Sequence, residues 1–212
     1  FTYYGHSCFL VEINNKRILF DPFITPNELA KDININDIKC DYIAISHGHA
    51  DHIADAVAIA TRTHATVICA FEIYEWMSKQ GVANFRPMNT GGKWSSDFGS
   101  VKCVVAQHSS VLPDGTYGGN PMGFIIDGGE GKAFYYAGDT ALTMDMKLIP
   151  HFCPHLTTAL LPIGDNFTMG MDDAALAAEF CGARKVVGLH YDTFGYIKID
   201  HEKAKVTFGE KE

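Results

Sequence analysis

The chain contains 212 residues, of which 47% are hydrophobic and 20% are charged, and this composition is typical of a globular protein with a well-buried core. The formal net charge is −8 and Lys and Arg form no basic run, so we expect no nucleic-acid partner. The sequence opens with no signal-peptide pattern and contains no apolar stretch of membrane-spanning length. We therefore expect a single cytoplasmic domain, residues 1–212, without a membrane span.

Short β-rich runs recur along the chain, with turn residues between them. Asn14 and Asn15 separate the second run from the third, and this pair predicts a tight hairpin. The runs that we expect to form strands are residues 2–4, 8–13, 17–20, 42–45, 66–69, 101–106, 123–126, 133–137, 158–162 and 186–189.

Helical patterns lie between the later runs. Apolar side chains between Ile53 and Ala60 share one helical face, and further helices are predicted over residues 71–80, 140–149 and 172–180. A segment rich in Gly and Pro, residues 113–121, predicts a surface loop beside a site. Because a block of strands precedes strands that alternate with helices, the sequence predicts an α/β fold with mixed sheets.

The cysteines lie singly along the chain, and several sit inside apolar runs. They have no C-x-x-C spacing, so we interpret them as buried, reduced side chains and not as metal ligands or disulfides. They are Cys8, Cys40, Cys69, Cys103, Cys153 and Cys181.

The densest group of metal-binding side chains directly follows the apolar run at residues 42–45. It contains three imidazoles and one carboxylate within residues 47–52, namely His47, His49, Asp51 and His52. Imidazole nitrogen and carboxylate oxygen are ligands that zinc, manganese and iron accept. A strand that ends in a tight turn would hold them in place, so the pattern predicts a metal site.

Three later polar residues occupy the same kind of position, because each follows a β-rich run. They are His108, Asp139 and His190. Ligands that several strand ends deliver can meet at one edge of a layered fold. Each residue taken alone has a structural interpretation, such as a hydrogen-bonded histidine or a helix-capping aspartate, but their order after residues 47–52 favours a shared site.

This ordered set resembles the metallo-β-lactamase superfamily, and the resemblance covers most of the chain. The segments at residues 5–8, 19–22 and 161–170 are similar to those of small metal-dependent hydrolases, a branch related to the ascorbate-6-phosphate lactonases and, more distantly, to N-acyl-phosphatidylethanolamine phospholipase D. The resemblance implies a four-layer αβ/βα sandwich with two mixed sheets and the metals at one sheet edge.

The resemblance also implies how the ligands are shared between two divalent metal ions. One ion would take His47, His49 and His108, the other would take Asp51, His52 and His190, and Asp139 would bridge them. Zinc is the first expectation. No cysteine belongs to the set, so manganese or iron are alternatives, and the pattern departs from that of true β-lactamases.

A dinuclear centre of this kind predicts a hydrolase. Two divalent ions can share a water molecule, lower its pKa and provide a hydroxide nucleophile that attacks a small ester, lactone or phosphodiester. The centre would carry net positive charge, which favours a small, anionic substrate over a long polyanion.

Two residues are candidates for catalytic roles. Asp51 belongs to the predicted ligand set, and the resemblance places the turn of His6 near the metals, where it could bind substrate or donate a proton. A structural turn histidine is the alternative interpretation of His6. Asp21 is expected to orient either a ligand or the turn at residues 47–52. Asn166 and Thr168 are candidates for the entrance of the site, and a loop or helix-capping role is their structural alternative.

Two alternative functions use the same motifs. An RNase of the metallo-β-lactamase type would need an RNA-binding region, which the acidic chain does not offer. A non-catalytic metal-binding or sensing protein on the same fold would be expected to have lost ligands, whereas this set is complete. Lactonase-like relatives also make a homo-oligomer an open alternative.

Overall fold

Two six-stranded β-sheets form the middle of the fold, and their strands follow one another in chain order across each sheet. The computed structural model describes residues 1–129 and 131–209. The first sheet has the order β1 (Thr2–Gly5), β2 (Cys8–Ile13), β3 (Lys16–Phe20), β4 (Tyr42–Ala44), β5 (Thr66–Ala70) and β6 (Phe85–Met88). The second has the order β12 (Lys185–Leu189), β11 (Thr158–Pro162), β10 (Ala133–Tyr136), β9 (Met122–Asp127), β8 (Gly99–Val105) and β7 (Lys93–Ser96).

Both sheets are mixed, as the sequence predicts. In the first sheet β1, β2 and β3 pair antiparallel, and β3 to β6 pair parallel. In the second, β7 to β10 pair antiparallel, and β10 to β12 pair parallel. Asn14 and Asn15 form the predicted hairpin turn, and both have a positive φ, 51° and 62°, which the mirror-image type I′ turn requires.

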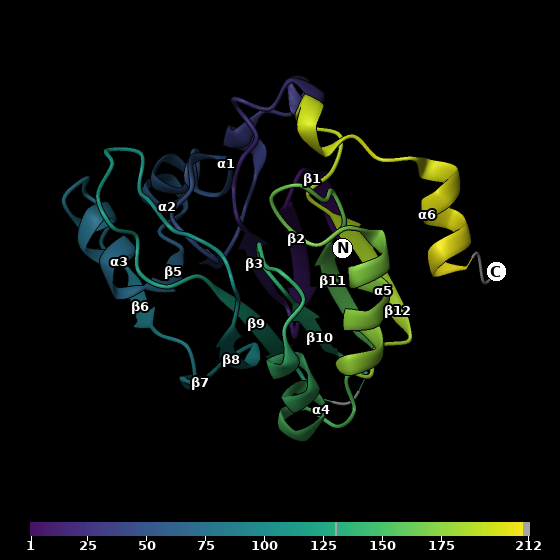
Figure 1. Cartoon of the computed structure of the whole chain (residues 1–212). Helices are drawn as coiled ribbons and strands as arrows, with labels where there is room; N and C mark the ends of the chain where they lie inside the picture. The colour runs from purple at the N-terminus through teal and green to yellow at the C-terminus, as the bar shows by residue number, and fades with distance from the viewer. Residues whose placement is uncertain (130, 210–212) are drawn as a thin grey trace.

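Helices cover the outer faces of the two sheets, so the fold has four layers. Helices α2 and α3 lie beside the first sheet and α4 and α5 beside the second (Figure 1). The helices are α1 (Ala50–Ile53), α2 (Ala56–Thr63), α3 (Phe71–Ser78), α4 (Ile149–Phe152), α5 (Met171–Phe180) and α6 (His201–Phe208). Single 3-10 turns span Glu28–Ala30, Ile35–Asp37, Met144–Leu148 and Gly195–Ile197. This arrangement confirms the predicted αβ/βα sandwich.

Aromatic side chains fill the space between the two sheets. Phe20 of β3 stacks on Phe9 at 4.5 Å between ring centroids and meets the edge of Tyr136 of β10 at 5.5 Å. All three rings are buried. Burial of one such ring stabilises the fold by about 1.5–3 kcal/mol. Because these rings pack against one another across the two sheets, they hold the sheets together near the strand ends that carry the predicted metal ligands.

Two edge strands, β6 and β7, were not predicted. Strand β6 contains Pro87, which cannot donate to a ladder and is tolerated only because β6 lies at the edge of its sheet. Strand β7 begins with Lys93 and is polar along most of its length. Edge strands of this kind have no apolar alternation for a sequence pattern to detect.

The helix predicted over residues 140–149 is wrong. Residues 140–143 are not helical, a 3-10 turn covers Met144–Leu148, and α4 begins only at Ile149. Pro150 lies in the first turn of α4, where the missing N–H of proline costs nothing, so it starts a helix and does not end one. The Thr140 hydroxyl accepts from the backbone N–H of Gln107 at 2.9 Å, which ties this segment to the end of β8.

The six cysteines are all buried and unpaired with one another, as predicted. Within residues 1–129 and 131–209, no helix has the length and apolar character needed to cross a membrane.

Candidate metal centre

The polar cluster lies at one edge of the sandwich, where the ends of four strands meet. Residues 47–52 follow β4 and enter α1, with His49 at the N-cap of that helix. His108 follows β8, Asp139 follows β10 and His190 follows β12. The structure therefore brings all seven predicted ligands together, and it does so through the strand-end placement on which the prediction was based.

His47, His49 and His108 form a first group of imidazoles. The His47 Nε2 atom lies 2.9 Å from the Nδ1 atom of His49, and the His108 ring lies 5.0 Å and 5.1 Å from the other two ring centroids. One nitrogen from each ring lies within 4.8 Å of the others, which is close enough for one ion to contact all three.

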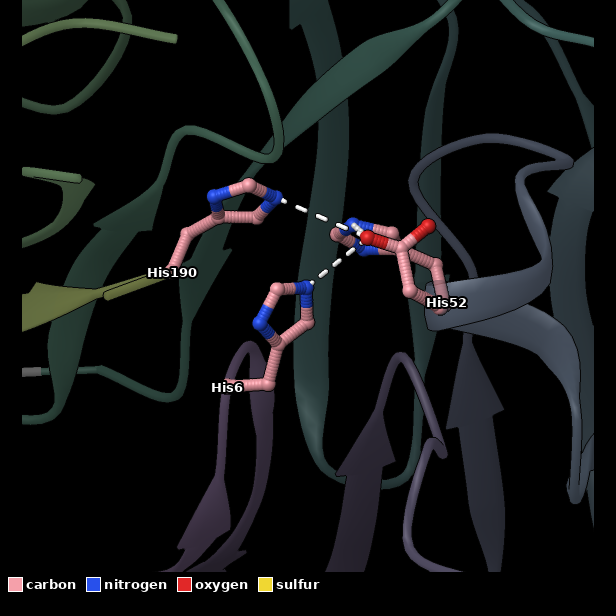
Figure 2. A group of neighbouring side chains, drawn as sticks. His6, His52 and His190 are labelled. Atoms are coloured by element: carbon pink, nitrogen blue, oxygen red, sulfur yellow. Dashed lines mark hydrogen bonds and ion pairs between the residues drawn. The ribbon is translucent and has the colours of Figure 1, made fainter. Parts of the chain in front are cut away.

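Asp51, His52 and His190 form a second group, and His6 joins it. Figure 2 shows the rings of His6, His52 and His190 turned toward one carboxylate. The Oδ2 atom of Asp51 lies 2.9 Å from His6 Nε2 and 3.7 Å from the Nε2 atoms of both His52 and His190. The ligand atoms of these four residues again lie within 4.8 Å of one another.

Asp139 lies between the two groups. Its Oδ2 atom is 3.6 Å from His108 Nε2 and 3.9 Å from His47 Nε2 in the first group. The same oxygen is 3.3 Å from His52 Nε2 and 2.9 Å from His190 Nε2 in the second. One carboxylate oxygen is thus within 4 Å of two imidazoles from each group.

The donor set fits divalent cations. It consists only of imidazole nitrogens and carboxylate oxygens, and His52 Nε2 and Asp139 Oδ1 are buried without a hydrogen-bond partner among the described residues. A buried polar atom that lacks a partner costs free energy, whereas a bound cation would satisfy it. These unpaired atoms point to metal ions as the missing partners.

The carboxylates create a negative environment around the second group, at His52 and His190. Burial raises the pKa of Asp139, but His52 and His190 outweigh it and hold that pKa well below its usual range. Burial lowers the pKa of His190, yet the nearby Asp139 and Asp51 raise it to about 9. The negative potential that favours the protonated imidazole of His190 also favours binding of a divalent cation. A bound cation would replace the proton, because a metal ligand must be the neutral imidazole.

Asp21 contacts His52 and the turn before His47, in the orienting role that the sequence suggested. It is fully buried and follows β3, and its Oδ2 atom lies 2.8 Å from His52 Nδ1. Its carboxylate also accepts from the backbone N–H of Ser46 at 2.7 Å, from the Ser46 hydroxyl at 2.5 Å and from the Tyr136 hydroxyl at 2.5 Å. The His52 ring is therefore fixed with Nε2 facing Asp51 and Asp139.

His6 is buried and both of its ring nitrogens are hydrogen bonded. Nε2 bonds to Asp51 and Nδ1 lies 2.9 Å from the Thr193 hydroxyl, while the His6 carbonyl accepts from the backbone N–H of His190. Burial lowers the pKa of His6 to about 4. The turn between β1 and β2 thus links Asp51 to the segment after β12.

A cavity of about 280 Å³ opens above the cluster. It is lined by His49, Asp51, His108, Ser109, Asp139, Phe167, His190 and Phe194. Asn166 and Thr168, the predicted entrance residues, are not among these lining residues, whereas their neighbour Phe167 is. The sequence prediction missed both phenylalanines, although each lies in a polar connection after a strand, where a large apolar side chain is unusual.

The loop predicted over residues 113–121 has no regular strand or helix, and it packs beside the first group of ligands. An isolated bridge pairs Val111 with Tyr117, and the backbone N–H of Gly118 donates to the Ser110 carbonyl. The Ser110 hydroxyl in turn accepts from the N–H of Gly48 at 3.0 Å. The loop therefore holds the turn between His47 and His49.

The remaining histidines, His64, His151, His155 and His201, lie outside both ligand groups. His201 pairs with Asp192 at 2.7 Å, and His155 pairs with Asp127 at 3.1 Å. Asp192 therefore binds His201 and does not orient His190, whose Nδ1 atom has no partner among the described residues.

Comparison with known proteins places this geometry among metal-dependent hydrolases. Residues 16–191 match the model of a beta-lactamase superfamily domain. The chain is 54% identical to a UPF0173 metal-dependent hydrolase of Christiangramia forsetii and 51% identical to one of Flavobacterium johnsoniae, over 99% of this chain and 92% of each relative. The solved structure of Igni18, a metallo hydrolase of Ignicoccus hospitalis, superposes with a TM-score of 0.84 at 35% identity and covers 98% of this chain and 88% of its own.

Proposed function

The chain belongs to the beta-lactamase superfamily as a member of its UPF0173 metal-dependent hydrolases, and on this premise we propose that a dinuclear metal centre hydrolyses a small ester, lactone or phosphodiester. The position of Asp139 carries the proposal. A single oxygen that approaches two imidazoles from each ligand group suits a carboxylate shared between two cations, and a mononuclear site would have no use for the second group.

Each ion has three further ligands in this proposal. His47, His49 and His108 hold one ion, and Asp51, His52 and His190 hold the other. Divalent ions bound there would polarise a carbonyl or phosphoryl oxygen and lower the pKa of water toward neutrality. Zinc is the first candidate, and a set of nitrogen and oxygen ligands also accepts manganese or iron.

The protein's own side chains set the geometry. Asp21 fixes the orientation of His52, and Ser46 links Asp21 to the turn that carries His47, because its hydroxyl lies 2.9 Å from His47 Nδ1. A cavity next to the ligands provides the space for a substrate, and its lining includes His49, Asp51, His108, Asp139 and His190.

The test of this function is turnover that depends on added metal. The chelated protein is reloaded with Zn²⁺, Mn²⁺ or Fe²⁺ and assayed with phenyl acetate, a γ-lactone and bis(p-nitrophenyl) phosphate. We expect hydrolysis of at least one class, rising with metal up to two equivalents per chain. If no metal restores turnover of any of the three substrates, the proposal fails.

His6 is a positioning residue in this account, because both of its ring nitrogens bind protein atoms and neither is free for substrate. His6→Ala removes one partner of Asp51, so we expect weaker binding of the second metal ion and a kcat about 10- to 100-fold lower, with KM little changed. Metal titration and steady-state kinetics measure both effects.

His6→Gln, which can still donate to Asp51, is expected to recover part of the lost metal affinity. His201→Ala is the matched control, since His201 also pairs with an aspartate but lies away from the ligands. A direct substrate contact by His6 would instead raise KM and leave metal affinity unchanged, and that result would overturn the positioning role.

A further inference from the structure

Two phenylalanines from different connections form the apolar wall of the cavity above the ligands. Phe167 lies between β11 and α5, and Phe194 lies between β12 and α6. We propose that they select an uncharged ester or lactone that carries a flat apolar group, such as an aryl group. The inference rests on the proposed hydrolase function and narrows its substrate class.

Phe167 is held in an exposed position by its own connection. Asp165 and Asn166 both have a positive φ, 62° and 58°, and the backbone N–H of Asp165 donates to the Met169 carbonyl, which closes a tight turn. The Phe167 side chain is 52% exposed at the tip of this turn and contacts the Tyr196 ring at 6.2 Å. A hydrogen-bonded turn that presents an apolar ring to a cavity suits a binding surface.

Phe194 lines the same cavity and packs against His6, the residue that hydrogen bonds to Asp51. Its ring meets the edge of the His6 ring at 5.4 Å and the Phe23 ring at 6.2 Å. The side chain remains 39% exposed, so one part packs against the protein and another part faces the cavity. A planar apolar group could pack against this ring while its ester or lactone carbonyl reaches the ligands.

The charge of the cavity wall argues against an anionic substituent. Among the described residues that line the cavity, none is Lys or Arg, and both of its carboxylates, Asp51 and Asp139, belong to the proposed ligand set. Sites that recognise phosphate or carboxylate groups commonly place an Arg or Lys against them. A phosphate group placed away from the metal ions would therefore meet no cationic side chain here, so only a negative charge that the ions themselves contact would be neutralised.

The volume of the cavity limits the substrate to a small molecule. At about 280 Å³ it lies just below the range of roughly 300–1,000 Å³ that is typical of ligand sites. A single ring with a short ester arm suits this volume better than a long acyl chain or a nucleic acid.

Binding of hydroxamates to the metal-loaded protein tests the inference without turnover. Benzohydroxamate, acetohydroxamate and succinate monohydroxamate share one metal-binding head and differ in an aryl, a methyl and a charged group. We expect the wild-type protein to bind benzohydroxamate more tightly than acetohydroxamate. We expect it to bind succinate monohydroxamate no more tightly than acetohydroxamate. Calorimetric titration gives the three values of Kd.

Phe167→Ala and Phe194→Ala are each expected to reduce the preference for benzohydroxamate by about three- to tenfold, the range known for aromatic contacts. Phe71→Ala is the matched control, because Phe71 is 51% exposed and lies on α3, away from the cavity lining. It should keep the wild-type preference. The Phe167 ring packs against Tyr196 and, among the described residues, makes no ring contact with His6, so Phe167→Ala tests the wall separately from the ligand support.

Two kinds of failure are distinguishable in this experiment. The substrate inference is overturned, and the hydrolase proposal stands, if acetohydroxamate binds but the wild-type protein shows no preference for benzohydroxamate. The same conclusion follows if both variants keep that preference, or if succinate monohydroxamate binds most tightly. If no hydroxamate binds the metal-loaded protein, the proposed metal centre itself fails, and the inference fails with it.

Discussion

Replacing Asp139 with alanine is expected to lower kcat/KM by about 10³-fold and to reduce the metal content from two ions per chain toward one or none. The reason is geometric, because Oδ2 of Asp139 lies within 4 Å of two imidazoles from each ligand group. Without this carboxylate the two ions would lose their shared ligand and the charge that offsets their repulsion. Metal analysis of the purified variant, together with steady-state kinetics, measures both effects.

Asp139→Asn separates the charge of the side chain from its volume, and we expect it to lose nearly as much activity as Asp139→Ala. The matched control is Asp127→Ala, which removes another aspartate at the end of a strand of the same sheet that pairs with a histidine. The control should keep both ions. Circular dichroism should show that all three variants remain folded. Full retention of both metals and of turnover in Asp139→Ala would rule out the shared ligand.

Replacing Asp21 with alanine is expected to have the largest effect on stability. Asp21 is fully buried and its carboxylate is bonded to the Ser46 backbone and hydroxyl, to the Tyr136 hydroxyl and to His52. Removal leaves these partners without their acceptor and opens a void between the sheets. The free energy of unfolding should fall by about 3–5 kcal/mol, as measured by urea denaturation in the presence of a chelator.

Metal binding distinguishes this role of Asp21 from general stability. His52 loses its orienting contact, so the folded Asp21→Ala variant should bind the second metal about 10- to 100-fold more weakly. Asp55→Ala is the control, because Asp55 is also buried but accepts from the backbone of Ile24 and Thr25 and contacts no ligand. It should lose stability and keep its metal affinity. Unchanged stability of Asp21→Ala, or unchanged affinity in its folded fraction, would contradict this account.

The ligand positions could be predicted from the sequence because they depend on a local rule. Buried strands are recognisable as apolar β-branched and aromatic runs, and the chain places a predicted ligand one to three residues after the end of four of them. Once the strands form two sheets, strand ends such as those before His108 and His190 meet at one edge. The supporting role of Asp21 was predictable for the same reason, since it directly follows β3.

Other features depend on contacts between distant segments, and the sequence pattern could not reveal them. Phe167 and Phe194 are adjacent to the same cavity only because β11 and β12 are neighbours in the folded sheet. Helix α6 was missed because it buries none of its residues, so it has no apolar stripe, and its N-cap Asp200 accepts from the N–H groups of Glu202 and Lys203. The segment at residues 140–143 is held by hydrogen bonds to other loops, which override its helical pattern.

The most direct test of the central claim is a count of metal ions in the reloaded wild-type chain, combined with a crystal structure that locates them by anomalous scattering. We predict two ions per chain, one beside His47, His49 and His108 and one beside Asp51, His52 and His190, with Asp139 in contact with both. A single tightly bound ion, with no second ion near Asp139 and no turnover after reloading with zinc, manganese or iron, would contradict the account.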